Sequence, residues 1–134
     1  MRDRPIGVLV VDDQPDFPRA ARTMLGLTDD FAVVGEARSV PEALAALARP
    51  GGPPVDLVLM DVNMEPVDGI TGARQVLASA VATGATGPPV VVLCSTLGAG
   101  ELPAIPVDLD VSFLAKEALD PEALLAAYHR HHRH

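Results

Sequence analysis

What this sequence has little of narrows the class of protein first. A single cysteine among 134 residues, Cys94, excludes an internal disulfide framework. Basic residues number 10 against 18 acidic ones, and the net charge of −8 argues against direct binding of nucleic acid by this chain. No stretch approaches the roughly 18 apolar residues of a membrane span, and residues 1–5 lack the apolar segment of a signal peptide. We therefore expect a cytoplasmic protein that makes no membrane contact.

The core has to be built from aliphatic side chains, because tryptophan is absent and aromatic residues make up only 3% of the chain. Apolar, largely β-branched runs alternate with segments in which apolar residues recur at helical spacing. Strands are predicted at residues 6–11, 31–35, 55–60, 90–93 and 111–115, and helices at 17–25, 39–47, 70–77 and 120–128. This alternation predicts an α/β fold, a doubly wound five-stranded parallel sheet with helices on both faces.

Two segments depart from the regular alternation. The stretch from Thr96 to Val107 should hold the fourth helix, but Pro103 and Pro106 cannot sit comfortably in a helix interior. We expect an irregular or shortened element there. The folded domain should span residues 5–128, and the tail 129–134 (HRHHRH) is interpreted as a disordered end, with a metal-prone tract as the alternative.

Charged side chains end three of the predicted strands. Asp12 and Asp13 follow the first strand, Asp61 ends the third and Lys116 ends the fifth. Each alone fits a helix cap or a turn, but the carboxyl ends of parallel strands meet at one edge of a sheet, where ligands bind. The four side chains together therefore predict one site.

Three crowded carboxylates repel one another, and a hard divalent cation with oxygen ligands is the usual remedy. Mg²⁺ is the first candidate. With charge neutralised in this way, one carboxylate is free to attack phosphorus as a nucleophile, and Lys116 would add a compact positive charge beside the transferred group. A hydrolytic enzyme could use the same acids, but the expected loops supply no further acidic or histidine ligands, so we do not expect an enzyme with an external substrate.

Three segments resemble the receiver domains of bacterial two-component response regulators, the CheY-like receivers. They are VLVVDD at 8–13, DVNMEPVDG at 61–69 and FLAK at 113–116, and the resemblance covers residue 6 to about residue 128. Residues 31–47 (FAVVGEARSVPEALAAL) are similar to receivers joined to helix-turn-helix output domains of the NarL/LuxR type, which implies transcription regulation. The resemblance implies a flavodoxin-like fold with strand order 2-1-3-4-5.

The same resemblance implies a role for each matching residue. Asp61 would be the phosphoacceptor for a sensor histidine kinase. Mg²⁺ would be bound by the side chains of Asp13 and Asp61, by the backbone carbonyl of Asn63, and by Asp12 through water. Lys116 matches the lysine that contacts the phosphoryl group.

The resemblance also implies an output surface. Phe113 matches the aromatic switch position. In the family, the surface that changes on phosphorylation lies around the fourth helix, the fifth strand and the last helix, where the two prolines of the irregular segment fall. It could meet a partner protein, an appended domain or a second copy of the chain in a homodimer.

Two departures from the family pattern concern the site. Glu65 stands where the family has a proline, and Pro66 follows one residue late, which reshapes the loop beside Asp61. Cys94 falls at the position of the family's Ser or Thr switch hydroxyl, with Ser95 as the alternative if the strand ends one residue later. A thiol is a weak donor, so Cys94 predicts weaker coupling between phosphorylation and output.

Two other functions compete with phosphoacceptance. A pseudo-receiver that keeps the fold but acts as a phosphorylation-independent interaction module is favoured by Cys94 and the irregular fourth helix. The complete acid and lysine set favours the phosphoacceptor. A redox sensor built on Cys94 would need an exposed thiol of lowered pKa, and a buried small residue is the more ordinary interpretation.

Overall fold

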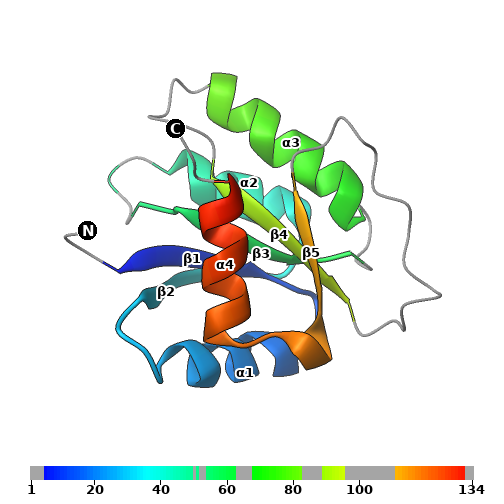
Figure 1. Ribbon diagram of the computed structural model, residues 1–134. Coiled ribbons are helices and arrows are strands. Elements are labelled where there is room, and N and C mark those ends of the chain that lie inside the picture. The colour runs from blue at the N-terminus through cyan, green and yellow to red at the C-terminus, as the bar shows by residue number, and fades with distance from the viewer. Residues whose placement is uncertain are drawn as a thin grey trace.

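The computed structural model describes residues 5–49, 51, 54–62, 68–82, 89–95 and 111–131. Strands and helices alternate along this part of the chain (Figure 1). The strands are β1 (Ile6–Val11), β2 (Phe31–Ala37), β3 (Leu57–Asp61), β4 (Val90–Ser95) and β5 (Ser112–Ala115). The helices are α1 (Asp16–Leu25), α2 (Val40–Ala48), α3 (Gly69–Ala82) and α4 (Pro121–His131), with a 3₁₀ turn, η2 (Lys116–Ala118), directly after β5.

All strand pairs are parallel, and the sheet has the order β2-β1-β3-β4-β5. The predicted fold class and strand order are therefore confirmed. In Figure 1, α1 and α4 lie on one face of the sheet and α2 and α3 on the other. None of the described helices is both long and apolar enough to cross a membrane.

Two apolar clusters, one on each face, hold the layers together. Because side chains alternate along a strand, each strand contributes to both clusters. The α1/α4 face buries, among others, Val10, Leu25, Leu59, Val92, Leu124 and Tyr128. The α2/α3 face buries, among others, Leu9, Val40, Met60, Ala73, Val76 and Leu93.

Side chains cap the starts of α2 and α4. The Ser39 hydroxyl accepts a hydrogen bond from the backbone N–H of Glu42 at 3.2 Å, and Glu42 accepts one from the backbone N–H of Arg38 at 3.3 Å, rather than from Ser39. The Asp120 carboxylate accepts from the N–H of Ala123 at 2.7 Å, as expected of a cap. These bonds satisfy amide groups that have no partner within their helices.

The third strand begins at Leu57, two residues later than predicted. The Asp56 carboxylate accepts a hydrogen bond from the backbone N–H of Gly7 at 2.8 Å, so a side chain takes the place of a strand carbonyl. A Cβ atom on Gly7 would lie 2.3 Å from the carbonyl oxygen of Pro54, and only glycine allows this approach. Conversely, β2 and β4 each extend two residues beyond the prediction, to Ala37 and Ser95.

The last helix corrects the prediction for the tail. Helix α4 continues to His131, so the expectation of disorder is wrong for residues 129–131, and residues 132–134 lie outside the described part. The guanidinium of Arg130 donates to the Ser112 hydroxyl at 3.2 Å and so ties the last turn of the helix to β5. The predicted irregular fourth helix, residues 96–107, also lies outside the described residues.

Candidate functional site

The strand ends bring the predicted acidic residues to one edge and one face of the sheet. Asp12, Asp61 and Cys94 each lie two residues after a side chain of the α1/α4 cluster, so alternation directs them to that same face. Asp61 and Cys94 are register partners in neighbouring strands. Lys116 follows directly after β5 at the same edge.

The four predicted charged groups meet there. The Lys116 ammonium donates to the Asp12 carboxylate at 2.8 Å and lies 3.9 Å from the Asp61 carboxylate. One carboxylate oxygen from each of Asp12, Asp13 and Asp61 lies within 4.8 Å of the others. Asp12 binds Lys116 through Oδ2, and its Oδ1 accepts a hydrogen bond from the backbone N–H of Gln14 at 2.8 Å. The side chain of Asp12 is 0% exposed and that of Asp61 9%, so these two carboxylates are largely shielded from water, whereas Asp13 is accessible to it.

The charge of Lys116 is stabilised by its surroundings. Burial alone would lower its pKa, but the hydrogen bond with Asp12 and the negative charges of Asp61 and Asp12 outweigh that effect and raise the pKa above its ordinary value. Lys116 therefore remains an ammonium ion throughout the physiological range. It is also the only lysine in the chain.

The position of Cys94 bears on the choice between the two switch candidates. Its thiol faces the carbonyl oxygen of Met60 at 3.6 Å, on the face that carries Asp61. Ser95 is buried and is the register partner of Ala115, one residue on, so the alternation of the strand directs it to the opposite face. Burial raises the pKa of the Cys94 thiol. A neutral, inaccessible thiol does not suit a redox sensor.

Residues 8–128 match the family of response regulator receiver domains. The chain belongs to this family. Among curated proteins, this receiver domain is 37% identical over 106 residues to protein-glutamate methylesterase/protein-glutamine glutaminase 3 of Anaeromyxobacter dehalogenans, a match that covers 75% of the chain and 30% of the relative. The chain spans less than a third of the length of the first curated relatives that it matches.

Solved receiver structures share the fold. The signal receiver domain of the response regulator NarL from Mycobacterium tuberculosis aligns with a TM-score of 0.71 and 26% identity, over 93% of this chain and 97% of that one. A chain of the CheX–CheY–BeF₃–Mg²⁺ complex from Borrelia burgdorferi aligns with a TM-score of 0.67 and 26% identity, over 92% of this chain and 87% of that one. The resemblance stated from the sequence motifs is therefore confirmed.

The motif after Asp61 has a structural explanation in this receiver domain. The Asp68 carboxylate accepts from the backbone N–H of Thr71 at 2.8 Å and caps α3. A Cβ atom on Gly69 would lie 2.4 Å from the carbonyl oxygen of Asp61, so glycine lets the helix start against the end of β3. The aspartate and glycine of the motif thus position the backbone at Asp61.

Of four further residues singled out from the sequence, the structure describes one. Asn63, Glu65 and Pro66 are outside the described residues. Phe113, the expected switch aromatic, lies in β5 and packs, half-buried, against the α2/α3 cluster. It therefore points to the face opposite Asp61.

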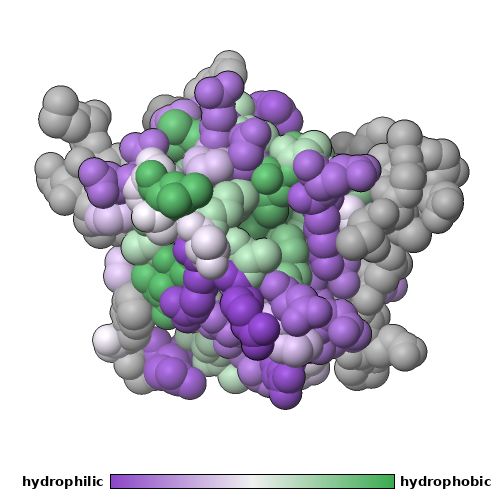
Figure 2. Space-filling model, turned by 90° about the horizontal axis from the view of Figure 1, so that it is seen from below, coloured by the Kyte–Doolittle hydropathy of each residue, from purple (hydrophilic) through white to green (hydrophobic). Residues whose placement is uncertain are grey.

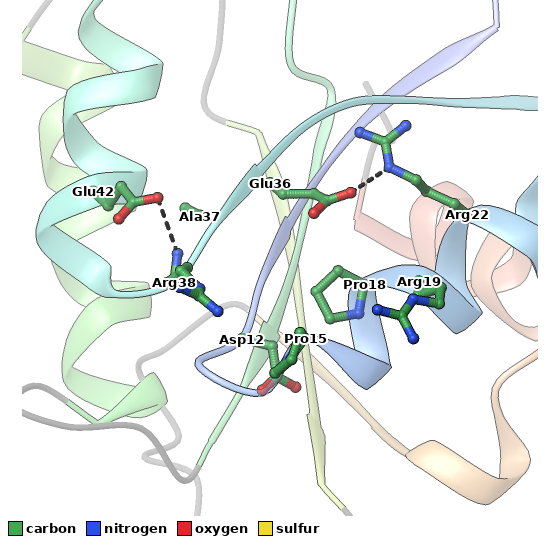
Figure 3. Close-up of a pocket in the computed structure, with 9 residues that line it drawn as sticks. All are labelled: Asp12, Pro15, Pro18, Arg19, Arg22, Glu36, Ala37, Arg38 and Glu42. Carbon is green, nitrogen blue, oxygen red and sulfur yellow. Dashed lines mark hydrogen bonds and ion pairs between the residues drawn. The ribbon is translucent and has the colours of Figure 1, made fainter.

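Beside Asp12, the receiver domain has an open hollow of about 520 Å³ between α1 and the β2–α2 junction (Figure 3). Arg19 and Arg38 flank it from opposite sides, and Arg22 pairs with Glu36 at its wall. Neither Asp61 nor Lys116 lines it. The hollow therefore lies beside the Asp12 side of the cluster without exposing its carboxylate, and its arginines bring positive charge near the acidic side chains.

Seen from the side of α1, the surface mixes hydrophilic and hydrophobic areas (Figure 2). Within the described part of the chain, the large hydrophobic side chain with high exposure is Leu27, which is 81% exposed. It follows α1 directly and lies apart in sequence from the charged cluster.

One contact at the site was missed by sequence reasoning. Phe17 is assigned from its spacing to the buried stripe of the first helix, and it does pack against the α1/α4 cluster. Its ring also lies under the Lys116 ammonium, 4.4 Å from the ring centroid. The residues are far apart in the sequence, and no local pattern indicates their meeting.

Proposed function

We propose that this receiver domain accepts a phosphoryl group on the Asp61 carboxylate from a sensor histidine kinase and thereby controls an output surface. The observation that carries the proposal is the meeting of Lys116 with the Asp12 and Asp61 carboxylates at the carboxyl edge of the sheet. A fixed cation beside a largely buried carboxylate, 9% exposed in Asp61, suits a reaction in which negative charge is transferred to that carboxylate.

The donor set fits Mg²⁺. This ion holds oxygen ligands at about 2.0–2.1 Å, so pairs of its ligands lie about 3 to 4 Å apart. The oxygens of Asp13 and Asp61, which lie within 4.8 Å of each other, need only a small adjustment to reach such spacing. Asp13 and Asp61 would hold the ion directly, Asp12 through water, and Asn63 through its backbone carbonyl. When bound, the ion would neutralise the phosphoryl oxygens during transfer.

The chain's own residues would carry the transfer. A carboxylate oxygen of Asp61 forms a bond to phosphorus while the bond from phosphorus to the donor's imidazole nitrogen breaks, and the imidazole leaves with that electron pair. Lys116, held as an ammonium ion, turns from Asp12 toward the incoming phosphoryl oxygens and donates hydrogen bonds to them. The domain would turn over only its own phosphoryl group and no external substrate.

Output would depend on the strand ends beside Asp61. We assign the switch position to Cys94, which shares the face and register of Asp61, with Phe113 as the aromatic partner. A thiol bonds weakly to a phosphoryl oxygen, so coupling to output would be weak. The similarity to the NarL receiver favours a DNA-binding output domain, and the methylesterase relatives favour an enzymatic one. Either would belong to a longer, cytoplasmic protein. A second copy of the chain or a separate partner protein could also bind the output surface.

The test is the intact mass of the protein after incubation with Mg²⁺ and acetyl phosphate. We expect the gain of one phosphoryl group in the parent and none in Asp61→Asn. Asp56→Asn is the matched control, because Asp56 lies at the opposite end of β3 and should leave the gain unchanged. A folded parent that gains no mass with acetyl phosphate or with candidate kinases would overturn the proposal in favour of a phosphorylation-independent module.

A further inference from the structure

The Lys116 ammonium is held by groups from three parts of the chain. It donates to Asp12 at the end of β1, lies 3.9 Å from Asp61 at the end of β3, and sits over the ring of Phe17 in the first turn of α1. Its side chain is 16% exposed. In Figure 1, η2, which begins with Lys116, lies next to that first turn.

Hydrogen bonding alone does not fix the position of the Lys116 ammonium. Its only hydrogen-bond partner among the described side chains is Asp12, and the four-carbon stem of a lysine is flexible, so the ammonium can pivot about one contact. The face of an aromatic ring attracts a cation, whereas an aliphatic side chain at the same place would only remove water from it. The ring therefore restricts the ammonium without competing for its N–H donors.

We propose that Phe17 is a positioning residue for Lys116, whose ring face keeps the ammonium at the Asp12 and Asp61 carboxylates, ready to receive the phosphoryl oxygens. The inference rests on the proposed phosphorylation of Asp61 for its functional consequence. The contact itself is a property of the unphosphorylated domain. Phe17 contacts neither carboxylate in this role and acts through the lysine.

Two substitutions of Phe17 distinguish the effect of its aromatic ring from the effect of its apolar packing. Phe17→Leu keeps an apolar side chain against the α1/α4 cluster but removes the ring face, whereas Phe17→Tyr keeps the ring. Phe31→Leu is the matched control, because Phe31 belongs to the same apolar cluster but pairs with Ile6 at the opposite end of the strands. If Phe17→Leu does not fold, Phe17→Met takes its place, since it fills similar space without a ring.

The single lysine makes the contact directly measurable. Protein labelled with ¹³C-lysine gives one set of lysine side-chain resonances, and a ring beneath the ammonium shifts the Lys116 ε protons upfield. We expect this shift to be lost in Phe17→Leu, and to persist in Phe17→Tyr and Phe31→Leu.

The rate of phosphorylation by acetyl phosphate, per folded molecule, is the second readout. A cation–π contact contributes about 0.5–2 kcal/mol, which corresponds to about 2- to 30-fold in rate. We expect a loss of that size in Phe17→Leu, recovery in Phe17→Tyr, and no change in Phe31→Leu.

The two readouts separate the two proposals. If the parent gains no phosphoryl group, the proposed function fails, and the lysine resonance still decides whether the ring holds the ammonium. If Phe17→Leu leaves both the ε-proton shift and the rate as in the parent, or if Phe31→Leu lowers the rate equally, the positioning role is overturned.

Discussion

The two faces of the sheet differ in what their side chains do at the carboxyl edge. On the α2/α3 face, the described strand ends carry uncharged side chains, namely the apolar Val11 and Leu93 and, after Leu93, the buried Ser95. On the α1/α4 face, the same strands end in Asp12, Asp61 and Cys94. Uncharged side chains thus continue to the carboxyl edge of the sheet on the α2/α3 face, whereas charged side chains occupy that edge on the α1/α4 face.

This difference follows from the alternation of side chains along a strand. A shift of one residue in β1 or β3 would exchange the two faces of that strand and bury Asp12 or Asp61 against α2 and α3. The apolar α2/α3 face therefore fixes the register, and the register delivers the acidic residues to the site. The comparison predicts that changes on one face affect stability alone, whereas changes on the other also affect phosphorylation.

The largest effect is expected from truncating the core on either face. Leu93→Ala and Leu59→Ala each remove a fully buried side chain and should lower the free energy of unfolding by about 2–5 kcal/mol. Urea unfolding measures the loss. Only Leu59→Ala, two residues before Asp61 on its face, should also slow phosphorylation per folded molecule. A comparable slowing in Leu93→Ala would contradict the separation of the faces.

The ion pair of Lys116 on the α1/α4 face should make the stability of the domain depend on pH. Its pKa is raised in the folded domain, so the pair's contribution to stability is complete below the unfolded pKa of about 10.4 and is lost as pH rises through the higher folded value. The parent should be more stable than Lys116→Met by about 1.5–3 kcal/mol at pH 7 to 9, as for a hydrogen bond between charged groups. Above about pH 10.4 the difference, followed by urea unfolding, should shrink. A difference that shrinks below pH 9 would contradict this sign.

A smaller change is expected from relieving repulsion within the acidic cluster. Asp13→Asn removes one of three close negative charges, and at water-like screening this is worth about 1 kcal/mol. Without Mg²⁺, the variant should therefore unfold at higher urea concentration than the parent, and Mg²⁺ should stabilise it less. Asp29→Asn, an exposed change outside the cluster, should alter neither quantity.

The smallest effect concerns the switch position. Cys94→Ser supplies a stronger donor in nearly the same space and should increase the stabilisation that phosphorylation brings by about 0.5–1 kcal/mol. Cys94→Val, which has no donor, should decrease it. The difference between urea midpoints with and without acetyl phosphate and Mg²⁺ gives this quantity for each variant. Equal values in the two variants would remove Cys94 from the switch.

The sequence predicted most of the fold because its signals are local. Apolar runs, the Ser39 cap and the early proline of α2 each act within a few residues, and strict alternation then leaves few topologies. The site followed because strand ends converge in a parallel sheet. The roles given to Asp61, Cys94, Phe113 and the metal ligands stay predictions until the chemistry is measured.

What escaped prediction depends on contacts between distant segments. The late start of β3 results from the Asp56 side chain binding Gly7, and the long α4 from Arg130 binding Ser112. Phe17 contributes to the helical stripe in any interpretation of its spacing, so its contact with Lys116 is visible only in three dimensions.

The start of α3 has a mechanical consequence for Asp61. The N–H of Gly69 donates to the carbonyl oxygen of Val62 at 3.0 Å, and the N–H of Val62 donates to the carbonyl oxygen of Cys94 at 3.0 Å. The backbone directly after Asp61 is thus clamped between a helix and a neighbouring strand, and Gly69 leaves no room for it to retreat. If Asp61 is phosphorylated as proposed, we therefore expect the added volume to displace Lys116, which lies 3.9 Å from the carboxylate, rather than this backbone.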